Sequence, residues 1–392
     1  MTHDNTDATR RARYRARDWL RRHSSTTAAR CGWAPTGAAV TVHETPDGRR
    51  HATGVVSCGL TWLCPVCSAR IQAVRARILG ESLRRHVHSG GQIVMWTATL
   101  RHHRGTLLAH LWDQVSRSWH AAASGAAWRQ ACERLGTPYP GRMGRVESRI
   151  PYVRTVEVTV GEESGWHPHV HVLLYLPTHA TDADIRDLCD GMHARWIRAA
   201  RRAGHDAAPA GQHWTVVHGS RIDRALAAYL GKQVLGAGAE VVLGAQKKGR
   251  RGRYTPMQIL RALADGRQEP RLLRWWREYE EASQRRRQLV PAPGWLAHQG
   301  LGCTLDEAGE LAASSWADEG ESAAEAETRP VAVIGRDLVI ATAARGRWWR
   351  VLVDGQDLRD LRPAWIRTCT TAQLGVELGR WDSGRGCLLV LE

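Results

Sequence analysis

Two histidines separated by a single residue carry the strongest chemical signal in this chain of 392 residues. His169 and His171 stand in the run G-W-H-P-H-V-H-V-L-L (residues 165–174), which otherwise has the apolar character of a buried strand. Strand side chains alternate between faces, so the two imidazoles project to one side, about 7 Å apart along the strand. Such a pair can bind one divalent metal ion. An isolated H-x-H pair more often faces solvent, and the surrounding sequence has to decide between the two interpretations.

A third ligand for this ion can come from the preceding strand or from a later helix. Residues 152–160 alternate with period two and are followed by a turn-rich segment. A hairpin centred on Glu163 sets Glu157 across from His169, with Cβ atoms roughly 5 Å apart. Gln233 is the rival third ligand. A mixed imidazole and carboxylate site with open positions suits Mg²⁺ or Mn²⁺ acting on phosphate oxygens.

A tyrosine further along the chain supplies a nucleophile. Residues 221–234 have helical spacing with an apolar stripe at every fourth position. Tyr229 lies off this stripe, and Lys232 and Gln233 share its face. A metal that polarises a phosphate and a tyrosine that attacks it are the minimum requirement for a phosphotyrosine bond to DNA. Lysine is rare among the 55 Lys and Arg residues, so Lys232 is a candidate for a compact charge that arginine does not replace. The alternative is that Tyr229 is an ordinary residue of an amphipathic helix.

The order of these motifs resembles the HUH endonucleases, specifically the rolling-circle plasmid replication initiators of actinobacterial type. The resemblance spans residues 31–295. It rests on a strand ending T-A-T-L-R-H (97–102), a strand containing E-V-T-V (157–160), the histidine strand, a helix with Y-L-G-K (229–232), and the segments R-Y-T-P-M-Q-I-L (253–260) and W-W-R-E-Y-E (275–280).

The resemblance implies an α+β fold, a ferredoxin- or RRM-like five-stranded antiparallel sheet with flanking helices and the two histidines on its central strand. It also implies that Tyr229 attacks the nick site of a plasmid origin, leaving a 5′-phosphotyrosyl link and a 3′-OH primer, and that the strand is later rejoined. In some relatives a glutamate four residues before the tyrosine activates water to end the cycle. Here that position is Ala225, so termination by this route is not implied.

Four of the nine cysteines have the spacing of a metal site. Cys64 and Cys67 form a C-x-x-C knuckle, to which Cys31 and Cys58 add two further thiolates. A hairpin with strands at 39–43 and 54–57 would bring Cys31 near Cys58. A C-x-x-C pair can also be redox-active, but no thioredoxin-like βαβ pattern follows, and the spacing favours structural Zn²⁺. The remaining cysteines are expected to be small buried apolar residues: Cys132, Cys189, Cys303, Cys369 and Cys387.

Composition indicates a polyanionic partner. The formal net charge is +16, and a basic loop is expected to contact DNA phosphates through Lys247, Lys248, Arg250, Arg251 and Arg253. No apolar run is long enough to cross a membrane. The basic N-terminus lacks the apolar segment of a secretory signal. We therefore expect a cytoplasmic protein whose partner is plasmid origin DNA, single-stranded at the nick site.

The pattern of elements predicts five regions. They are a basic N-terminal arm forming an amphipathic helix (1–30), a four-cysteine zinc-knuckle region with a helix (31–90), the nicking and joining domain (91–295), an acidic linker (296–330) and a small accessory α+β module (331–392). Helices are expected at 68–86, 105–135 and 182–203, and strands at 92–102 and 213–218.

Two other functions fit parts of the sequence. A transposase would use the same histidine and tyrosine chemistry, although the cysteine cluster and the length count against it. A non-catalytic zinc-dependent DNA-binding regulator would explain the cysteines and the charge, but leaves the histidine pair and Tyr229 without a role. No G-x-x-x-x-G-K-[ST] motif occurs, so a replication initiator of this kind would need a host helicase and a host DNA polymerase.

Overall fold

The computed structural model describes the chain in two compact units, one of residues 1–73 and 310–392, the other of residues 74–309. The described backbone covers 3–34, 36, 39–44, 50–53, 55–141, 143–217, 253–301 and six strands between 329 and 388; side chains are described for 11–34, 36, 55–141, 143–217 and 253–301. Several predicted site residues lie outside these ranges: Ala225, Tyr229, Lys232, Gln233, Lys247, Lys248, Arg250 and Arg251.

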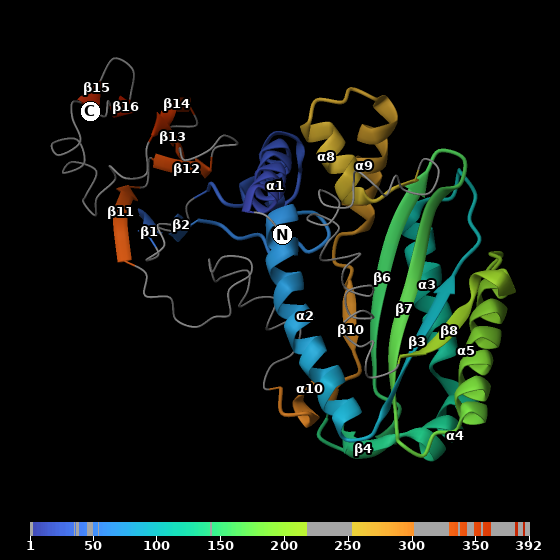
Figure 1. The fold of residues 1–392 in the computed structure, drawn as a ribbon. Helices are drawn as coiled ribbons and strands as arrows, with labels where there is room; N and C mark the ends of the chain where they lie inside the picture. Colours follow the sequence, from blue (N-terminus) through green and yellow to red (C-terminus); the bar gives the residue numbers. More distant parts are fainter. Residues whose placement is uncertain are drawn as a thin grey trace. The chain divides into compact units, whose positions relative to one another are not determined.

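An antiparallel sheet forms the centre of the second unit (Figure 1). Its main path runs in the order β10 (Leu289–Pro291), β6 (Tyr152–Gly161), β7 (Gly165–Leu176), β3 (Gln92–Thr99) and β8 (His213–Val217), and β9 (Arg253–Tyr254) pairs with β6. All of these pairings are antiparallel. The α+β class is therefore confirmed, with one strand more than expected. The histidine strand β7 is the middle strand of the five-strand path.

Helices α3 (Leu108–Ala122) and α5 (Asp182–Arg202) cover one face of this sheet (Figure 1). Trp96 of β3 is fully buried there and contacts Trp196 of α5 with ring centroids 5.9 Å apart. The helix α5 begins at a capping box in which Thr181 and Asp184 satisfy each other's backbone N–H groups. The side chains of β3 and β7 that point to this face are apolar because α3 and α5 bury them.

The expectation of a single helix over 105–135 is wrong. The segment forms two helices, α3 and α4 (Gly125–Leu135). Ser124 is extended and Gly125 has a φ of 82°, a left-handed conformation that glycine adopts without steric cost and that a continuing helix excludes.

The opposite face of the sheet is closed over only part of its length. Leu173 and Tyr175 of β7 pack with Leu79 and Leu83 of α2 (Pro65–His88) and with Trp295 of α10 (Trp295–His298). Nearer the start of β7, the side chains become half-buried and alternate with buried ones. This half of the face is where the histidines lie.

The remaining helices of this unit lie near the start of β7. They are α8 (Pro256–Ala264), which begins at a capping box of Thr255 and Gln258, and α9 (Pro270–Ala282). Glu278 of α9 accepts a hydrogen bond of 2.8 Å from the backbone N–H of Leu108, at the beginning of α3. A separate two-stranded ribbon, β4 (Thr137–Pro140) and β5 (Val146–Arg149), joins α4 to β6.

The first unit contains the predicted N-terminal helix and hairpin. The helix is α1 (His3–His23), followed by a short 3-10 turn, η1 (Thr27–Arg30). The hairpin pairs β1 (Ala39–Glu44) with β2 (Arg50–Thr53), so its second strand lies earlier than expected. On its other edge β1 pairs with β11 (Arg329–Gly335).

The other C-terminal strands form small sheets of their own. β12 (Leu338–Thr342), β13 (Trp349–Val353) and β14 (Gln356–Leu361) make one, and β15 (Trp381–Asp382) pairs with β16 (Cys387–Leu388). Among the described residues of the whole chain, no helix has the length and apolar character needed to cross a membrane.

Candidate functional site

The sheet aligns the two motif histidines with polar residues on both neighbouring strands. On β6, Glu157 pairs with His169 and Thr155 pairs with His171. On β3, Thr97 pairs with His171 and Thr99 pairs with His169. The predicted register of Glu157 is therefore confirmed. Since directly paired residues share a face of the sheet, these side chains converge on the half of the face that α2 and α10 leave open.

His171 is held by partners on both sides. Its Nδ1 lies 3.0 Å from the hydroxyl of Thr97, and its Nε2 lies 3.4 Å from a carboxylate oxygen of Glu157. The side chains of His171 and Glu157 are 15% and 16% exposed, so solvent reaches them only partly. A ring oriented through one nitrogen presents the other in a fixed direction, which is how protein imidazoles are positioned for metal binding.

The spacing of these atoms fits a single cation. Two ligand atoms each about 2.1 Å from one ion lie roughly 3 to 4 Å apart, and the 3.4 Å between His171 and Glu157 falls in that range. The rings of His169 and His171 are nearly parallel, with centroids 6.2 Å apart. His169, His171 and Glu157 do not form a closed set, because within the described residues only four cysteines bring three or more ligand atoms within 4.8 Å of one another.

Two further histidines extend the row, and the sequence analysis did not single them out. His167 precedes His169 on the same face, with ring centroids 4.0 Å apart and the rings edge to face. Its Nδ1 contacts Nε2 of His102, which follows β3. The other ring nitrogen of His102 meets the carbonyl oxygen of Ser164. The alternation H-P-H-V-H was the available signal, since it puts His167 in phase with the two motif histidines.

The row is electrostatically unfavourable for positive charge. Burial lowers the pKa of His167 to about 2, and His169, His102 and Arg253 add repulsion. Burial also lowers the pKa of His102. Because a carbonyl accepts from Nδ1 of His102, its Nε2 is the acceptor and Nδ1 of His167 the donor. Both shifts in pKa favour the neutral ring, which is the form that binds metals.

Arg253 is the one member of the predicted basic loop that is described. It is exposed and belongs to β9, where it pairs with Gly161 at the end of β6. From there its charge acts on His102 and His167. A cation beside the histidine row is in a position to attract a phosphate group.

The four predicted zinc ligands meet in the first unit. The ligand atoms of Cys31, Cys58, Cys64 and Cys67 all lie within 4.8 Å of one another. The Sγ atom of Cys67 is 3.5 Å from that of Cys31 and 3.7 Å from that of Cys58, and Cys64 is 3.6 Å from Cys31. Four thiolates around one tetrahedral zinc ion, each at about 2.3 Å, are about 3.8 Å apart. The donor set and its spacing therefore fit Zn²⁺.

Local backbone contacts bring these cysteines together. Gly32 donates to the carbonyl of Val56 at 2.7 Å, and Val56 donates to Ala34 at 2.7 Å, which places the segment after Cys31 beside the one before Cys58. Cys64 directly precedes α2, and Cys67 lies in its first turn. These hydrogen bonds join residues next to Cys31 and Cys58 in the sequence. The predicted hairpin of residues 39–57 is therefore not what brings the two cysteines together.

The close packing of the four thiols shifts their pKa values in opposite directions. Hydrogen bonds from the other three cysteines lower the pKa of Cys67, whereas its neighbours raise the pKa of Cys64, as does burial. Four sulfurs this close cannot all ionise without a cation to compensate them. Cys132 and Cys189 are buried apart from the cluster, as predicted, and burial raises the pKa of each thiol.

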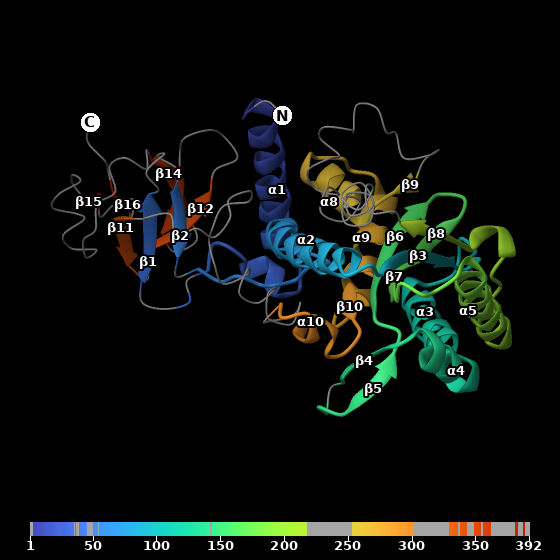
Figure 2. The ribbon, with the colours of Figure 1, turned by 60° about the horizontal axis from the view of Figure 1, so that its bottom comes forward.

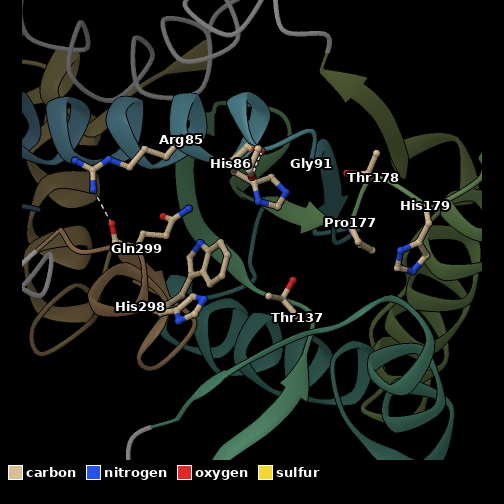
Figure 3. A pocket seen from close by; sticks show the side chains of 11 residues that line it. Arg85, His86, Gly91, Thr137, Pro177, Thr178, His179, His298 and Gln299 are labelled. Atoms are coloured by element: carbon tan, nitrogen blue, oxygen red, sulfur yellow. Dashed lines mark hydrogen bonds between the residues drawn. The ribbon is translucent and has the colours of Figure 1, made fainter.

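A cavity of about 580 Å³ lies at the other end of β7 (Figure 3). Its polar side chains already serve the fold. His86 bonds to the carbonyl of Leu176 at 2.9 Å, and Arg85 donates to the carbonyl of Gln299 at 2.6 Å. These contacts tie the end of α2 to β7 and to the segment after α10. The cavity contributes no group to the histidine row.

Fold and site together define an α+β protein with a histidine row on a central antiparallel strand and a separate four-cysteine cluster. The chain is 32% identical over 150 residues to a protein named "Protein rep" from Streptomyces lividans, covering 34% of this chain and 33% of that protein. It is 34% identical over 149 residues to a "Neomycin resistance protein" from Streptomyces cyanogenus, covering 35% and 34%. The chain thus spans about a third of the length of these relatives. No family model and no solved structure matches it.

Proposed function

We propose that this protein initiates rolling-circle replication of a plasmid by nicking one strand of the origin and later rejoining it. The observation that carries the proposal is the alignment of His169, His171 and Glu157 on one face of the central strand and its neighbour. The similarity to a Streptomyces protein named Rep supports the replication context. The net charge of +16 supports a DNA partner.

The histidine row binds and orients the scissile phosphate. His171, fixed by Thr97, and Glu157 would hold a Mg²⁺ or Mn²⁺ ion together with His169, or with Gln233 as the rival to Glu157. A divalent ion so bound supplies Lewis-acid polarisation of a phosphate oxygen. Arg253 adds positive charge at the neighbouring end of β6. The scissile phosphate would fill the positions that the protein ligands leave.

Tyr229 is the nucleophile in this proposal. Its hydroxyl oxygen bonds to the phosphorus, the bond from phosphorus to the 3′ oxygen breaks, and the departing oxygen takes up a proton as a free 3′-OH. The tyrosine loses its hydroxyl proton in the same step. Lys232, one helical turn later in the sequence, places a compact charge near the tyrosine. The phosphotyrosyl link conserves the energy of the phosphodiester bond, so a second transesterification can rejoin the strand.

The cysteine cluster has a structural part in the proposal. Its four buried or half-buried thiols fit Zn²⁺, and zinc of this kind contributes its binding free energy to folding. The basic residues Lys247, Lys248, Arg250 and Arg251 hold DNA by its phosphates. A host helicase and a host polymerase supply strand separation and synthesis.

A nicking assay with Tyr229→Phe tests the proposal. The Phe variant keeps the ring but has no hydroxyl, so both cleavage of an origin oligonucleotide and the SDS-resistant protein–DNA complex should disappear. Duplex binding should stay close to that of the wild type. A Phe variant that still forms the covalent complex would show that Tyr229 is misassigned. A wild-type protein that binds origin DNA with added Mn²⁺ but never cleaves it would favour the zinc-dependent regulator.

A further inference from the structure

We propose that the ribbon of β4 and β5, with the turn at residues 141–145, is an arm that enters the major groove of duplex DNA beside the nick site. The inference rests on the proposed function for the identity of the nucleic acid, and deepens it by assigning duplex contact to a part of the chain remote from the histidine row. Figure 2 shows this ribbon projecting beyond the helices around it.

The root of the arm is fixed to the body of its unit. Tyr139 of β4 is 1% exposed, and its ring centroid lies 5.3 Å from that of Trp295. On β5, the hydroxyl of Ser148 donates to the carbonyl of Cys132 at 2.8 Å. Gly294 has a φ of 83°, and a Cβ there would collide with the backbone of β4. A rigid root gives the projecting part a fixed direction.

The tip of the arm exposes apolar side chains in a well-formed turn. Met143 is 95% exposed and Val146 is 60% exposed; one other large hydrophobic side chain among those described is exposed. The turn is closed by a 2.9 Å hydrogen bond from the backbone of Gly141 to Arg145, and Gly144 has a φ of 73°. Apolar groups held out in solvent by an ordered turn are typical of a binding surface.

The charge of the arm complements DNA. The side chain of Arg145 is 82% exposed and lies 3.5 Å from Glu147, and Arg149 lies 2.7 Å from the same residue. One carboxylate therefore faces two guanidinium groups, which leaves the described part of the arm with a net positive charge. The major groove, about 12 Å wide, admits a two-stranded ribbon, where arginine meets phosphate or guanine and apolar groups meet thymine methyls.

The arm and the histidine row are connected through β7. The root residue Tyr139 packs in the same cluster as Tyr175 of β7. Tyr175 follows His171 by four residues, or about 13 Å along the strand. The root of the arm is thus anchored on the same strand that carries the histidine row.

Duplex affinity of arm variants in the full-length protein tests the inference. The probes are a fluorescein-labelled mixed-sequence duplex and its labelled single strand, titrated by anisotropy at several salt concentrations. Arg145→Ala should weaken duplex binding about three- to tenfold and lower the salt slope by about 1. Met143→Gln should weaken it less, and Glu147→Ala should strengthen it. Arg129→Ala, an exposed arginine on α4, removes the same charge away from the arm and is the matched control.

The inference is overturned if Arg145→Ala and Arg129→Ala have equal duplex affinities and salt slopes. It is equally overturned if single-strand binding falls as much as duplex binding in the arm variants. Nicking of a single-stranded origin oligonucleotide should be unchanged in all four variants. A wild-type protein that does not nick this oligonucleotide would contradict the proposed function. It would leave the inference about the arm standing, because the duplex titration does not depend on cleavage.

Discussion

The cysteine cluster and the histidine row both contain residue types that bind metals. The cysteine cluster brings four ligand atoms together, whereas the histidine row does not bring three together among the described residues. The four sulfurs converge within 4.8 Å because two backbone hydrogen bonds and the start of a helix bring them together. The histidines stand in one row on a strand, where His171 and Glu157 lie 3.4 Å apart and no third ligand atom among the described residues completes the set. A knuckle closes its own site, whereas in the proposed function the strand offers ligands and leaves positions for a phosphate.

The largest effect is expected from breaking the knuckle. Cys64→Ser should abolish tight zinc binding and leave the first unit unfolded or protease-sensitive, because structural zinc contributes on the order of 10 kcal/mol to folding. Zinc content by elemental analysis and limited proteolysis measure this. Cys132→Ser replaces a buried cysteine outside the cluster and should keep the zinc. A soluble Cys64→Ser protein holding zinc one-to-one would remove the structural role.

Loss of a ligand from the row should abolish nicking but not folding. His171→Ala deletes an imidazole outright, so added Mn²⁺ should restore little of the activity. Glu157→Gln keeps the shape and one oxygen but removes the charge, so nicking should require more metal and be partly rescued by it. Metal titrations of the nicking rate measure both. A titration shifted by Gln233→Ala and unaffected by Glu157→Gln would move the third ligand to the tyrosine helix.

Thr97 positions the proposed metal ligand His171 without binding the metal itself. Thr97→Val keeps the β-branched shape but removes the hydroxyl that lies 3.0 Å from His171. The metal concentration needed for half-maximal nicking should rise about tenfold, with the maximal rate largely retained. Thr97→Ser removes the methyl group but keeps the hydroxyl, and is the matched control. Equal effects of the two substitutions would mean that Thr97 acts through packing alone.

The sequence predicted this part of the site well because strand geometry is periodic. Alternation put His169 and His171 on one face, and the hairpin centred on Glu163 gave the correct partner for His169. The same rule would have included His167, but its contact with His102 depends on how the chain leaves β3. Thr97 was also in phase, and its role needed the pairing of β3 with β7.

Contacts between distant segments could not be predicted. The pairing of β1 with β11 joins residues nearly 300 positions apart, and no local pattern specifies such a partner. The ribbon of β4 and β5 contains two prolines in four residues of its first strand, which argues against a strand in the sequence. The end of α3 and the beginning of α4 at Gly125 lie inside a continuous helical pattern of the sequence. Only the left-handed φ of Gly125 in the structure shows that the helix is interrupted there.

The smallest effect concerns stability below neutral pH. Burial lowers the pKa of His193, which packs on Trp96, and of His86. Both stay neutral in the folded state while the unfolded chain takes up protons below about pH 6.5. Stability is therefore fully present above that pH and falls as the pH decreases, by at most about 1.4 kcal/mol per pH unit for each histidine.

Urea unfolding between pH 7 and pH 5 measures this slope. His193→Gln keeps a donor for the carbonyl of Thr97 but cannot titrate, so its stability should depend less steeply on pH. An unchanged slope would mean that His193 is not the group that protonates on unfolding.

Peptide mapping of the covalent adduct identifies the residue that attacks DNA, which we propose is Tyr229. After reaction with a nicked-strand oligonucleotide, trypsin cleaves at Arg224 and Lys232 and releases the peptide 225–232, in which Tyr229 is the single tyrosine. We predict that the nucleotide is attached to this peptide through its 5′ phosphate in the wild-type protein. The Tyr229→Phe variant should give no such adduct. An adduct on any other peptide, or cleavage without an adduct, would contradict transesterification by Tyr229.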